Sequence, residues 1–271
     1  MAKMKAGLTG FIPKDADFYE TLGSYAKMGY HAFENAGFLF RQGDPAENAK
    51  KVRDLGLELI TVGANLRDGQ RPDTVQLVKN ARLAGVERVT FYHSSAASYR
   101  FADRPDLPEW PEVKEEIAAV DRLGKDLAQE GVTLVFHNHD PEFTTVYQGV
   151  PLFWLMAAAC EDLKFEIDLA WAHYAGWDPA KLIATLGDRV VSLHVKDYIP
   201  GDNFEYKSRT VRVPRYCAPG AGIVDLFACF QAAEKNGVQW AIIEQDMQYL
   251  LSHAESVQAA YYNMKETGFV E

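Results

Sequence analysis

Short apolar runs alternate with longer amphipathic stretches along the whole chain, and this alternation restricts its fold more than any other feature. We count eight such pairs along the 271 residues. Strands that alternate with helices build a parallel sheet with the helices outside it. Eight pairs in about 250 residues match the size of a (β/α)8 barrel. We therefore predict an α/β protein with the TIM-barrel architecture, forming a single domain over residues 1–271.

The expected elements follow from the position of the apolar runs and from turn residues. The expected strands are Ala6–Phe11, Tyr30–Glu34, Glu58–Val62, Arg88–His93, Val132–His139, Lys164–Asp168, Val190–His194 and Trp240–Glu244. The expected helices are Asp15–Lys27, Pro45–Leu55, Pro72–Ala84, Pro111–Glu130, Pro151–Ala159, Pro179–Leu186, Asp225–Asn236 and His253–Thr267. A doubly wound open sheet is the alternative, but it usually has fewer strands and a Gly-rich phosphate turn after the first one, which this chain lacks.

Composition narrows the class of protein. The formal net charge is −10 and the pI is near 5.2, whereas nucleic-acid binding proteins are typically basic. No stretch approaches the roughly 20 apolar residues of a membrane helix, and no signal peptide is recognised. The three cysteines follow no ligand spacing and fit reduced thiols. We expect a cytoplasmic protein that binds neither nucleic acid nor a membrane.

Polar side chains that suit a metal ion follow the apolar runs of the last four expected strands. His137 and His139 stand one residue apart at the end of the fifth run, and a strand places such residues on one face. Asp168, His194 and Glu244 end the next three runs. Carboxylates and imidazoles at neighbouring strand ends are typical ligands of a divalent cation such as Mn, Mg, Co or Zn. Each residue taken alone also fits a satisfied core or surface group.

Further polar and aromatic residues stand close to the same strand ends. Glu34 ends the second expected strand and His93 the fourth, where either side chain would line the mouth of the barrel. Lys196 follows His194 by two and shares its direction in a strand, although a loop ion pair with the next residue is the alternative. Trp171 would form an apolar wall against a sugar ring, or it would pack in the core.

Two long connections follow expected strand ends, from His93 to Trp110 and from Asp197 to Gly222. At the C-terminal face of a barrel, loops of this length tend to be lids or substrate clamps. Arg212 lies in the second connection. It is expected either to hold a phosphate or carboxylate of the substrate or to be a solvated loop charge.

These residues stand in segments that resemble the sugar phosphate isomerase/epimerase family of the xylose isomerase-like TIM-barrel superfamily. The similar segments run in family order over nearly the whole chain: 28–38 (MGYHAFENAGF), 137–143 (HNHDPEF), 165–168 (FEID), 193–197 (LHVKD), 220–225 (GAGIVD) and 243–246 (IEQD). Relatives often carry a glutamate between the two glycines of the fifth segment, where this chain has Ala221.

The resemblance implies a divalent metal ion at the mouth of the barrel, with Mn²⁺ as the first expectation. Asp168, His194 and Glu244 match ligand positions of the family. The ligand from strand five is open between Glu142, which we favour because it can fold back toward the site, and His137. The resemblance also implies that His139, with the neighbouring Asn138, lines the substrate pocket.

The resemblance implies an isomerase or epimerase that acts on a sugar or keto-polyol by removing a proton next to a carbonyl, through an enediolate. A lyase, dehydratase or keto-glycoside-cleaving enzyme with the same enolate chemistry is the first alternative, and a non-catalytic sugar-binding protein is the second. The candidate catalytic residues are Glu142, Glu244, His137, His139 and Lys196. The expected partner is a small sugar or keto-sugar, and a homo-oligomer is possible because relatives are often dimers or tetramers.

Overall fold

A computed structural model describes residues 2–66, 72–97, 107–200, 203–206, 209–212 and 214–271, with only the backbone for 203–206 and 209–212. The chain divides into two compact units. The first unit comprises Met1–Glu34, Lys51–Glu58 and Ile167–Glu271, and the second comprises Asn35–Lys50 and Leu59–Glu166. The expectation of a single domain stays a prediction.

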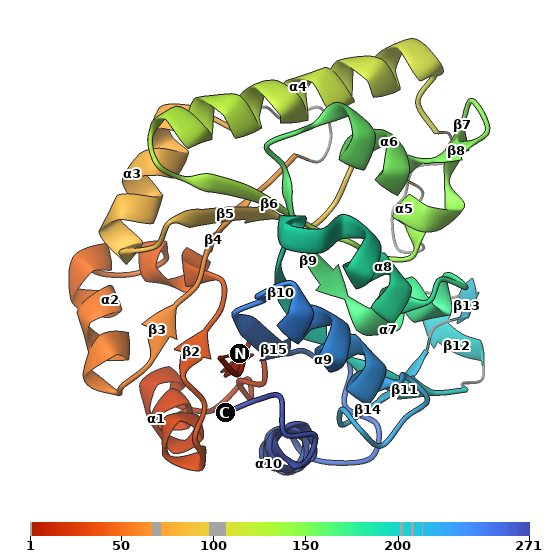
Figure 1. Ribbon diagram of the computed structural model, residues 1–271. Coiled ribbons are helices and arrows are strands. Elements are labelled where there is room, and N and C mark those ends of the chain that lie inside the picture. Colours follow the sequence, from red (N-terminus) through yellow and green to blue (C-terminus); the bar gives the residue numbers. More distant parts are fainter. Residues whose placement is uncertain (1, 67–71, 98–106, 201–202, 207–208, 213) are drawn as a thin grey trace. The chain divides into compact units, whose positions relative to one another are not determined.

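Parallel strands form the sheet of the first unit (Figure 1). These strands are β1 (Lys5–Leu8), β2 (Ala32–Phe33), β10 (Val190–Val195) and β15 (Trp240–Ile243), and their order is β2-β1-β15-β10. Leu8 pairs with Phe33 on one side and with Ile243 on the other, and Ile243 pairs in turn with Val195. The C-terminal ends of the four strands therefore lie level, and the residues that follow them emerge at the same edge.

The second unit has its own run of parallel strands. It contains β4 (Val62–Ala64), β5 (Arg88–Phe91), β6 (Thr133–His137) and the first three residues of β9 (Lys164–Asp168), in the order β9-β6-β5-β4. Phe136 pairs with Phe91 and with Phe165, and His137 pairs with Glu166. Three elements contain residues of both units: β9, α2 (Pro45–Asp54) and β3 (Glu58–Leu59). The parallel α/β arrangement predicted from the sequence is confirmed in each unit.

Helices and short antiparallel hairpins follow the strands. The helices of the first unit are α1 (Phe18–Met28), α7 (Leu169–Tyr174), α8 (Pro179–Leu186), α9 (Leu226–Lys235), α10 (His253–Glu266) and the 3-10 helix η3 (Gly187–Arg189). Those of the second unit are α3 (Thr74–Ala84), α4 (Trp110–Gln129), α5 (Pro141–Thr144), α6 (Leu152–Ala159) and the 3-10 helix η1 (Ala36–Phe40). The antiparallel pairs are β11 (Asp197–Ile199) with β14 (Arg215–Cys217), β12 (Asn203–Tyr206) with β13 (Arg209–Arg212), and β7 (Val146–Tyr147) with β8 (Val150–Pro151).

Local sequence signals explain where several helices begin and end. The carboxylates of Asp178 and Asp225 accept hydrogen bonds from backbone N–H groups in the first turns of α8 and α9, at 3.1 and 3.0 Å. Gly29 and Gly85 end α1 and α3 with φ of 113° and 71°, a conformation that side chains disfavour. Aspartates at helix starts and glycines at helix ends therefore set the bounds of these helices.

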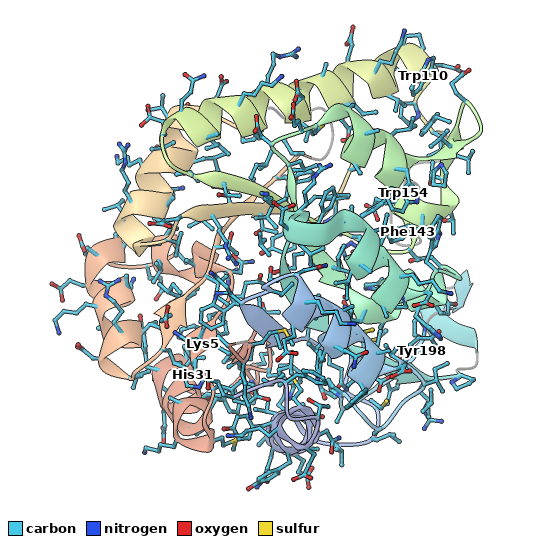
Figure 2. All side chains as sticks on the ribbon, viewed as in Figure 1. Lys5, His31, Trp110, Phe143, Trp154 and Tyr198 are labelled. Atoms are coloured by element: carbon cyan, nitrogen blue, oxygen red, sulfur yellow. The ribbon has the colours of Figure 1, made fainter. Side chains whose placement is uncertain are left out.

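Each unit has an apolar core. In the first unit, β1 and β15 are almost entirely buried on both faces, as parallel strands covered by helices require. Lys5, labelled in Figure 2, lies at the start of β1 with its Nζ 2.6 Å from Glu58 Oε1 and 5.4 Å from the ring centre of Trp240. In the second unit, the Phe153 ring lies 4.5 Å from that of Phe143 and 5.2 Å from that of Phe165.

Several strand boundaries differ from the prediction. The expected strand Glu58–Val62 is wrong, because β3 ends at Leu59 and β4 begins at Val62. Between them, the hydroxyl of Thr61 lies 2.8 Å from that of Thr90, so this residue faces a side-chain partner. β6 ends at His137, so His139 lies beyond the strand and the alternation rule does not apply to it. No helix in the described part of the chain is long and apolar enough to span a membrane.

Candidate metal centre

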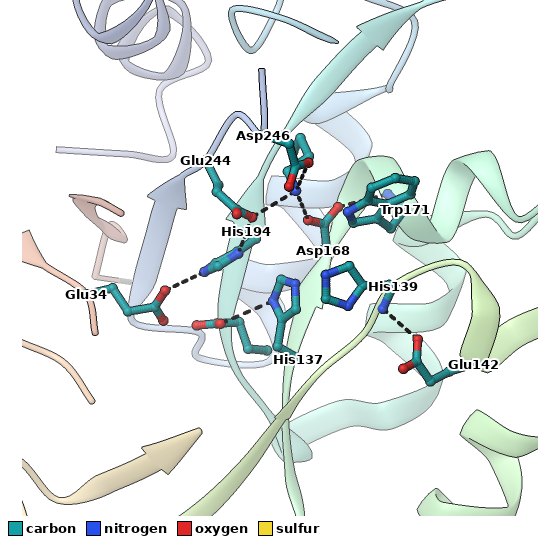
Figure 3. Close-up of polar contacts among 11 residues, drawn as sticks. Glu34, His137, His139, Glu142, Asp168, Trp171, His194, Glu244 and Asp246 are labelled. Atoms are coloured by element: carbon teal, nitrogen blue, oxygen red, sulfur yellow. Dashed lines mark hydrogen bonds and ion pairs between the residues drawn. The ribbon is translucent and has the colours of Figure 1, made fainter. Parts of the chain in front are cut away.

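Three of the predicted ligands, Asp168, His194 and Glu244, come together in the first unit (Figure 3). One ligand atom from each lies within 4.8 Å of those from the other two. Asp168 ends β9, His194 lies near the end of β10, and Glu244 directly follows β15. The level ends of β10 and β15 bring His194 and Glu244 to one edge of the sheet. Two carboxylates and one imidazole are a donor set that fits a divalent first-row metal ion or Mg²⁺.

Asp168 is fixed by the helix that it starts. Its side chain is fully buried, and Oδ1 accepts a hydrogen bond from the backbone N–H of Trp171 at 2.8 Å, which caps α7. Its second oxygen, Oδ2, lies 3.1 Å from Lys196 Nζ. Oδ1 is therefore used to cap the helix, and Oδ2 points toward Lys196 and the neighbouring carboxylates.

His194 lies between two carboxylates. Its Nε2 is 2.7 Å from Glu34 Oε2, and its Nδ1 is 2.9 Å from Glu244 Oε2. Glu34 directly follows β2, and its side chain is only 1% exposed. A neutral imidazole has a single N–H, so hydrogen bonds to two ionised carboxylates require the protonated ring. A metal ion on one nitrogen would leave the other nitrogen to its carboxylate.

Lys196 is a fully buried cation in the middle of three carboxylates. Its Nζ lies 3.1 Å from Asp168 Oδ2, 2.8 Å from Glu244 Oε2 and 2.8 Å from Asp246 Oδ2. Burial lowers the pKa of Lys196, but the negative charges of Asp168, Asp246 and Glu244 outweigh it and hold the pKa well above its ordinary value. The ammonium ion is therefore a permanent part of the cluster.

Aromatic rings cover this ammonium ion. Lys196 Nζ lies 5.4 Å from the ring centre of Trp171 and 5.6 Å from that of Tyr216, within the range of cation–π attraction. Burial and the charge of Asp246 raise the pKa of the Tyr216 phenol well above its ordinary value, so the group stays protonated and donates to Asp246. The predicted aromatic wall at Trp171 is a packing partner of Lys196 in this structure.

Asp197 does not form the loop ion pair with Lys196 that was the alternative. Its buried carboxylate accepts four backbone hydrogen bonds instead, from Tyr198, Gly220, Gly222 and Val224, at 2.8 to 3.1 Å. These contacts attach the segment after β14 to the end of β10. Farther along β11, the Tyr198 hydroxyl, labelled in Figure 2, lies 2.9 Å from Nδ1 of His173.

The histidines of the second unit lie close to one another. His137 Nδ1 lies 3.3 Å from Glu166 Oε1, and both side chains are buried. The His139 ring packs edge-on against His137 at 4.8 Å and stacks on His93 at 4.7 Å. The expected proximity of His137 and His139 is therefore observed, although a strand end rather than a strand face produces it.

Glu142 lies in the short helix α5, and its side chain is fully buried. Its Oε2 accepts a hydrogen bond from the backbone N–H of His139 at 2.8 Å. The adjacent Asn138 is also fully buried. Roles for these residues, as a metal ligand or in the substrate pocket, stay predictions. Arg212 lies in β13, and its side chain is outside the described part of the structure.

Sequence alternation indicates the direction of two further members of these clusters, Asp246 and Glu166, and misses a third, Tyr216. Asp246 follows Glu244 by two, which is a usable signal for a shared direction. Glu166 precedes Asp168 by two in the same strand. Tyr216 follows a long connection and carries no periodic signal, so only the pairing of β14 with β11 reveals its place over Lys196.

An α/β fold with a carboxylate and imidazole cluster at its strand ends defines the class of protein, and comparison with known proteins supplies the family. The chain belongs to the xylose isomerase-like TIM barrel family, which it matches over residues 23–261. This match confirms the predicted fold class and excludes the open doubly wound sheet. The family comprises sugar-modifying enzymes that act on small sugar substrates.

The individual proteins that the chain matches share little sequence identity with it. The chain is 25% identical to the inosose dehydratase of Geobacillus kaustophilus (strain HTA426), over 89% of this chain and 85% of the relative. A sugar phosphate isomerase/epimerase from Parabacteroides distasonis ATCC 8503 superposes with a TM-score of 0.74 at 17% identity and covers 100% of both chains. The IolI protein, crystallised with a bound zinc atom, superposes with a TM-score of 0.70 at 12% identity, over 97% of this chain and 98% of that one.

Proposed function

We propose that this protein is a divalent-metal-dependent isomerase or epimerase of a sugar or keto-polyol. The observation that carries the proposal is the convergence of Asp168, His194 and Glu244, whose ligand atoms lie within 4.8 Å of one another. Metal-binding groups at strand ends are the expected active-site position in a barrel of this family. When bound, the cation supplies Lewis-acid polarisation of a substrate carbonyl.

Burial divides the roles of the three ligands. Asp168 and His194 are 0% and 2% exposed, whereas the Glu244 side chain is 25% exposed. A substrate that approaches the cluster therefore meets Glu244 first. We assign to Glu244 the removal of the proton on the carbon next to the carbonyl. Returning that proton to the neighbouring carbon isomerises the sugar, and returning a proton to the opposite face of the same carbon epimerises it.

Lys196 supports this chemistry from within the protein. Its fully buried ammonium ion contacts Asp168 and Glu244 and so partly neutralises the acidic cluster. A charge partner of this kind favours the ionised form of both carboxylates, which is the form that binds metal or accepts a proton. Additional acid/base roles for Glu142, His137 and His139 remain part of the proposal and rest on the resemblance alone.

A dehydratase is the second candidate, and the match to an inosose dehydratase favours it. The first step is the same removal of a proton next to a carbonyl. The resulting enolate then expels a hydroxyl group from the β carbon, and this hydroxyl leaves as water after taking up a proton. Because the two reactions differ only after the first step, an assay of that step tests both.

Exchange of the α proton with solvent deuterium is the direct test. Protein treated with EDTA and reloaded with Mn²⁺, Co²⁺, Zn²⁺ or Mg²⁺ is incubated in D2O with ketoses and with a keto-cyclitol such as an inosose, and proton NMR records exchange and product. A stereoisomer or aldose supports the isomerase, and loss of water with a new enone absorption supports the dehydratase. Asp168→Asn should abolish exchange, whereas Asp162→Asn, an exposed carboxylate just before β9, should not. Metal-loaded protein that exchanges no α proton of any of these substrates would refute the proposal.

A further inference from the structure

Glu34 makes a contact that its predicted role as a substrate-binding residue does not explain. Its Oε2 lies 2.7 Å from Nε2 of His194, and the two side chains are 1% and 2% exposed. The carboxylate is thus shielded from a substrate in solution. Transfer of an ionised carboxylate into a protein interior is costly unless the charge has a hydrogen-bonded partner, and the ring of His194 supplies one.

The backbone holds Glu34 in place for this contact. β2 pairs with β1, and the backbone N–H of Glu34 donates to the carbonyl oxygen of Leu8 at 2.9 Å, which extends that pairing by one residue. In the strand order β2-β1-β15-β10, the side chain of Glu34 reaches past the two intervening strands to the histidine on β10. The sheet itself therefore sets the position of the carboxylate relative to the ring.

The second nitrogen of the ring, Nδ1, points to the candidate metal ligands. His194 Nδ1 lies 2.9 Å from Glu244 Oε2, and a ring nitrogen of His194 belongs to the group within 4.8 Å that includes Asp168 and Glu244. Histidines that bind metals almost always donate their second ring N–H to a carboxylate, a carbonyl or water, which fixes the tautomer and the ring orientation. Glu34 occupies that second position.

We propose that Glu34 is a positioning residue that accepts the Nε2 proton of His194 and so presents Nδ1 to a divalent cation. The inference rests on the proposed function in one respect, namely that His194 is a metal ligand. It changes the role of Glu34 from substrate binding to the positioning of a metal ligand. It also explains why a carboxylate follows β2, the strand farthest from β10 in the order given above.

Binding of Co²⁺ alone to the EDTA-treated full-length protein tests the inference. Titration calorimetry gives the affinity, and the visible absorption of Co²⁺ reports the ligand geometry. Loss of a partner of this kind typically weakens metal affinity about 10- to 100-fold. We expect such a loss in Glu34→Ala with an altered Co²⁺ spectrum, and a smaller loss in Glu34→Gln, whose amide oxygen still accepts the Nε2 proton. Glu87→Gln, at an exposed glutamate just before β5, is the matched control and should bind Co²⁺ like the wild type.

Further variants distinguish a failure of the proposed metal site from a failure of the positioning role of Glu34. His194→Asn should lose Co²⁺ binding, and if wild type and His194→Asn bind Co²⁺ equally, the proposed metal site itself is wrong. If His194→Asn loses binding but Glu34→Ala and Glu34→Gln keep wild-type affinity and spectrum, only the positioning role is overturned. A raised KM in Glu34→Gln with unchanged Co²⁺ affinity would overturn it in favour of a substrate contact. If Glu34→Ala does not fold, the affinity and spectrum of Glu34→Gln decide between these outcomes.

Discussion

Replacing Lys196 by methionine removes a buried cation that contacts three carboxylates and leaves an unbranched side chain only one atom shorter. In the wild type, Lys196 Nζ lies within 3.1 Å of oxygens of Asp168, Glu244 and Asp246. Breaking a buried ion pair by removing one partner costs about 3–5 kcal/mol. Glu244 and Asp246 are 25% and 36% exposed and recover hydration, so the lower end of that range applies.

The assay is thermal unfolding in EDTA and in excess Mn²⁺. A loss of about 3 kcal/mol corresponds to a fall in Tm of about 6–12 °C, at roughly 2–4 °C per kcal/mol for a chain of this size. At the proposed site, Mn²⁺ would supply positive charge to two of the same carboxylates, so it should raise the Tm of Lys196→Met more than that of the wild type. Lys125→Met is the control: the ammonium of Lys125 contacts Asp121 at 2.8 Å with 55% of its side chain exposed, and such pairs are worth at most about 1 kcal/mol.

Two results would refute this reasoning. If Lys196→Met and wild type unfold at the same temperature in EDTA, the three carboxylates do not depend on the ammonium ion for their charge balance. If Mn²⁺ stabilises both proteins equally although it binds both, the metal and the lysine do not share carboxylates. The second result would also weaken the assignment of Asp168 and Glu244 as ligands.

Two further predictions concern close packing and the thiols. A Cβ at position 222 would lie 2.2 Å from Asp197 Oδ1, so Gly222→Ala should lower the free energy of unfolding in urea by about 1–3 kcal/mol. Gly124→Ala is the control and should be neutral or stabilising, because no atom would lie nearer than 3.8 Å to the new Cβ. Equal effects of the two substitutions would mean that the loop around Gly222 adjusts without cost. All three cysteines are buried, and burial raises the pKa of Cys217 to about 12, so only about 1 in 10,000 of its thiols is ionised at pH 8. The reaction of the cysteines with a disulfide reagent should therefore be slow in the native protein and fast in urea. Rapid labelling of the native protein would contradict the burial of the thiols.

Local patterns sufficed for the parts of the fold that depend on neighbouring residues. The apolar run 164–168 gave β9 with its observed bounds, and the expected helix Asp15–Lys27 ends one residue before the observed end of α1 at Met28, which Gly29 caps. The prediction of one strand over 58–62 was wrong because hydrophobicity alone does not show where strand pairing is interrupted. Thr61 lies between β3 and β4, and its hydroxyl contacts that of Thr90. Strand bounds depend on which neighbour pairs with which residue, and this is information from the whole sheet.

The candidate site likewise has residues that the sequence predicts and contacts that it does not predict. Asp168, His194 and Glu244 were predictable because each follows a buried apolar run, and parallel strand ends meet at one edge of a sheet. The partners that these residues choose were not predictable. Glu34 reaches His194 from a strand 160 positions earlier in the chain, and Tyr216 reaches Lys196 only through the pairing of β11 with β14. Neither contact leaves a trace in spacing or composition.

Backbone hydrogen bonds hold the loop that contains Ala221. The resemblance described above leads us to expect a glutamate between the two glycines, at the position of Ala221. Here both glycine N–H groups donate to the buried carboxylate of Asp197, at 3.0 and 2.9 Å, while the side chain of Ala221 is exposed. Asp197 directly follows Lys196, so the loop and the buried cation share one anchor at the end of β10. The loop can therefore keep its place without a carboxylate at position 221, and the charge of the cluster rests on the other acidic residues.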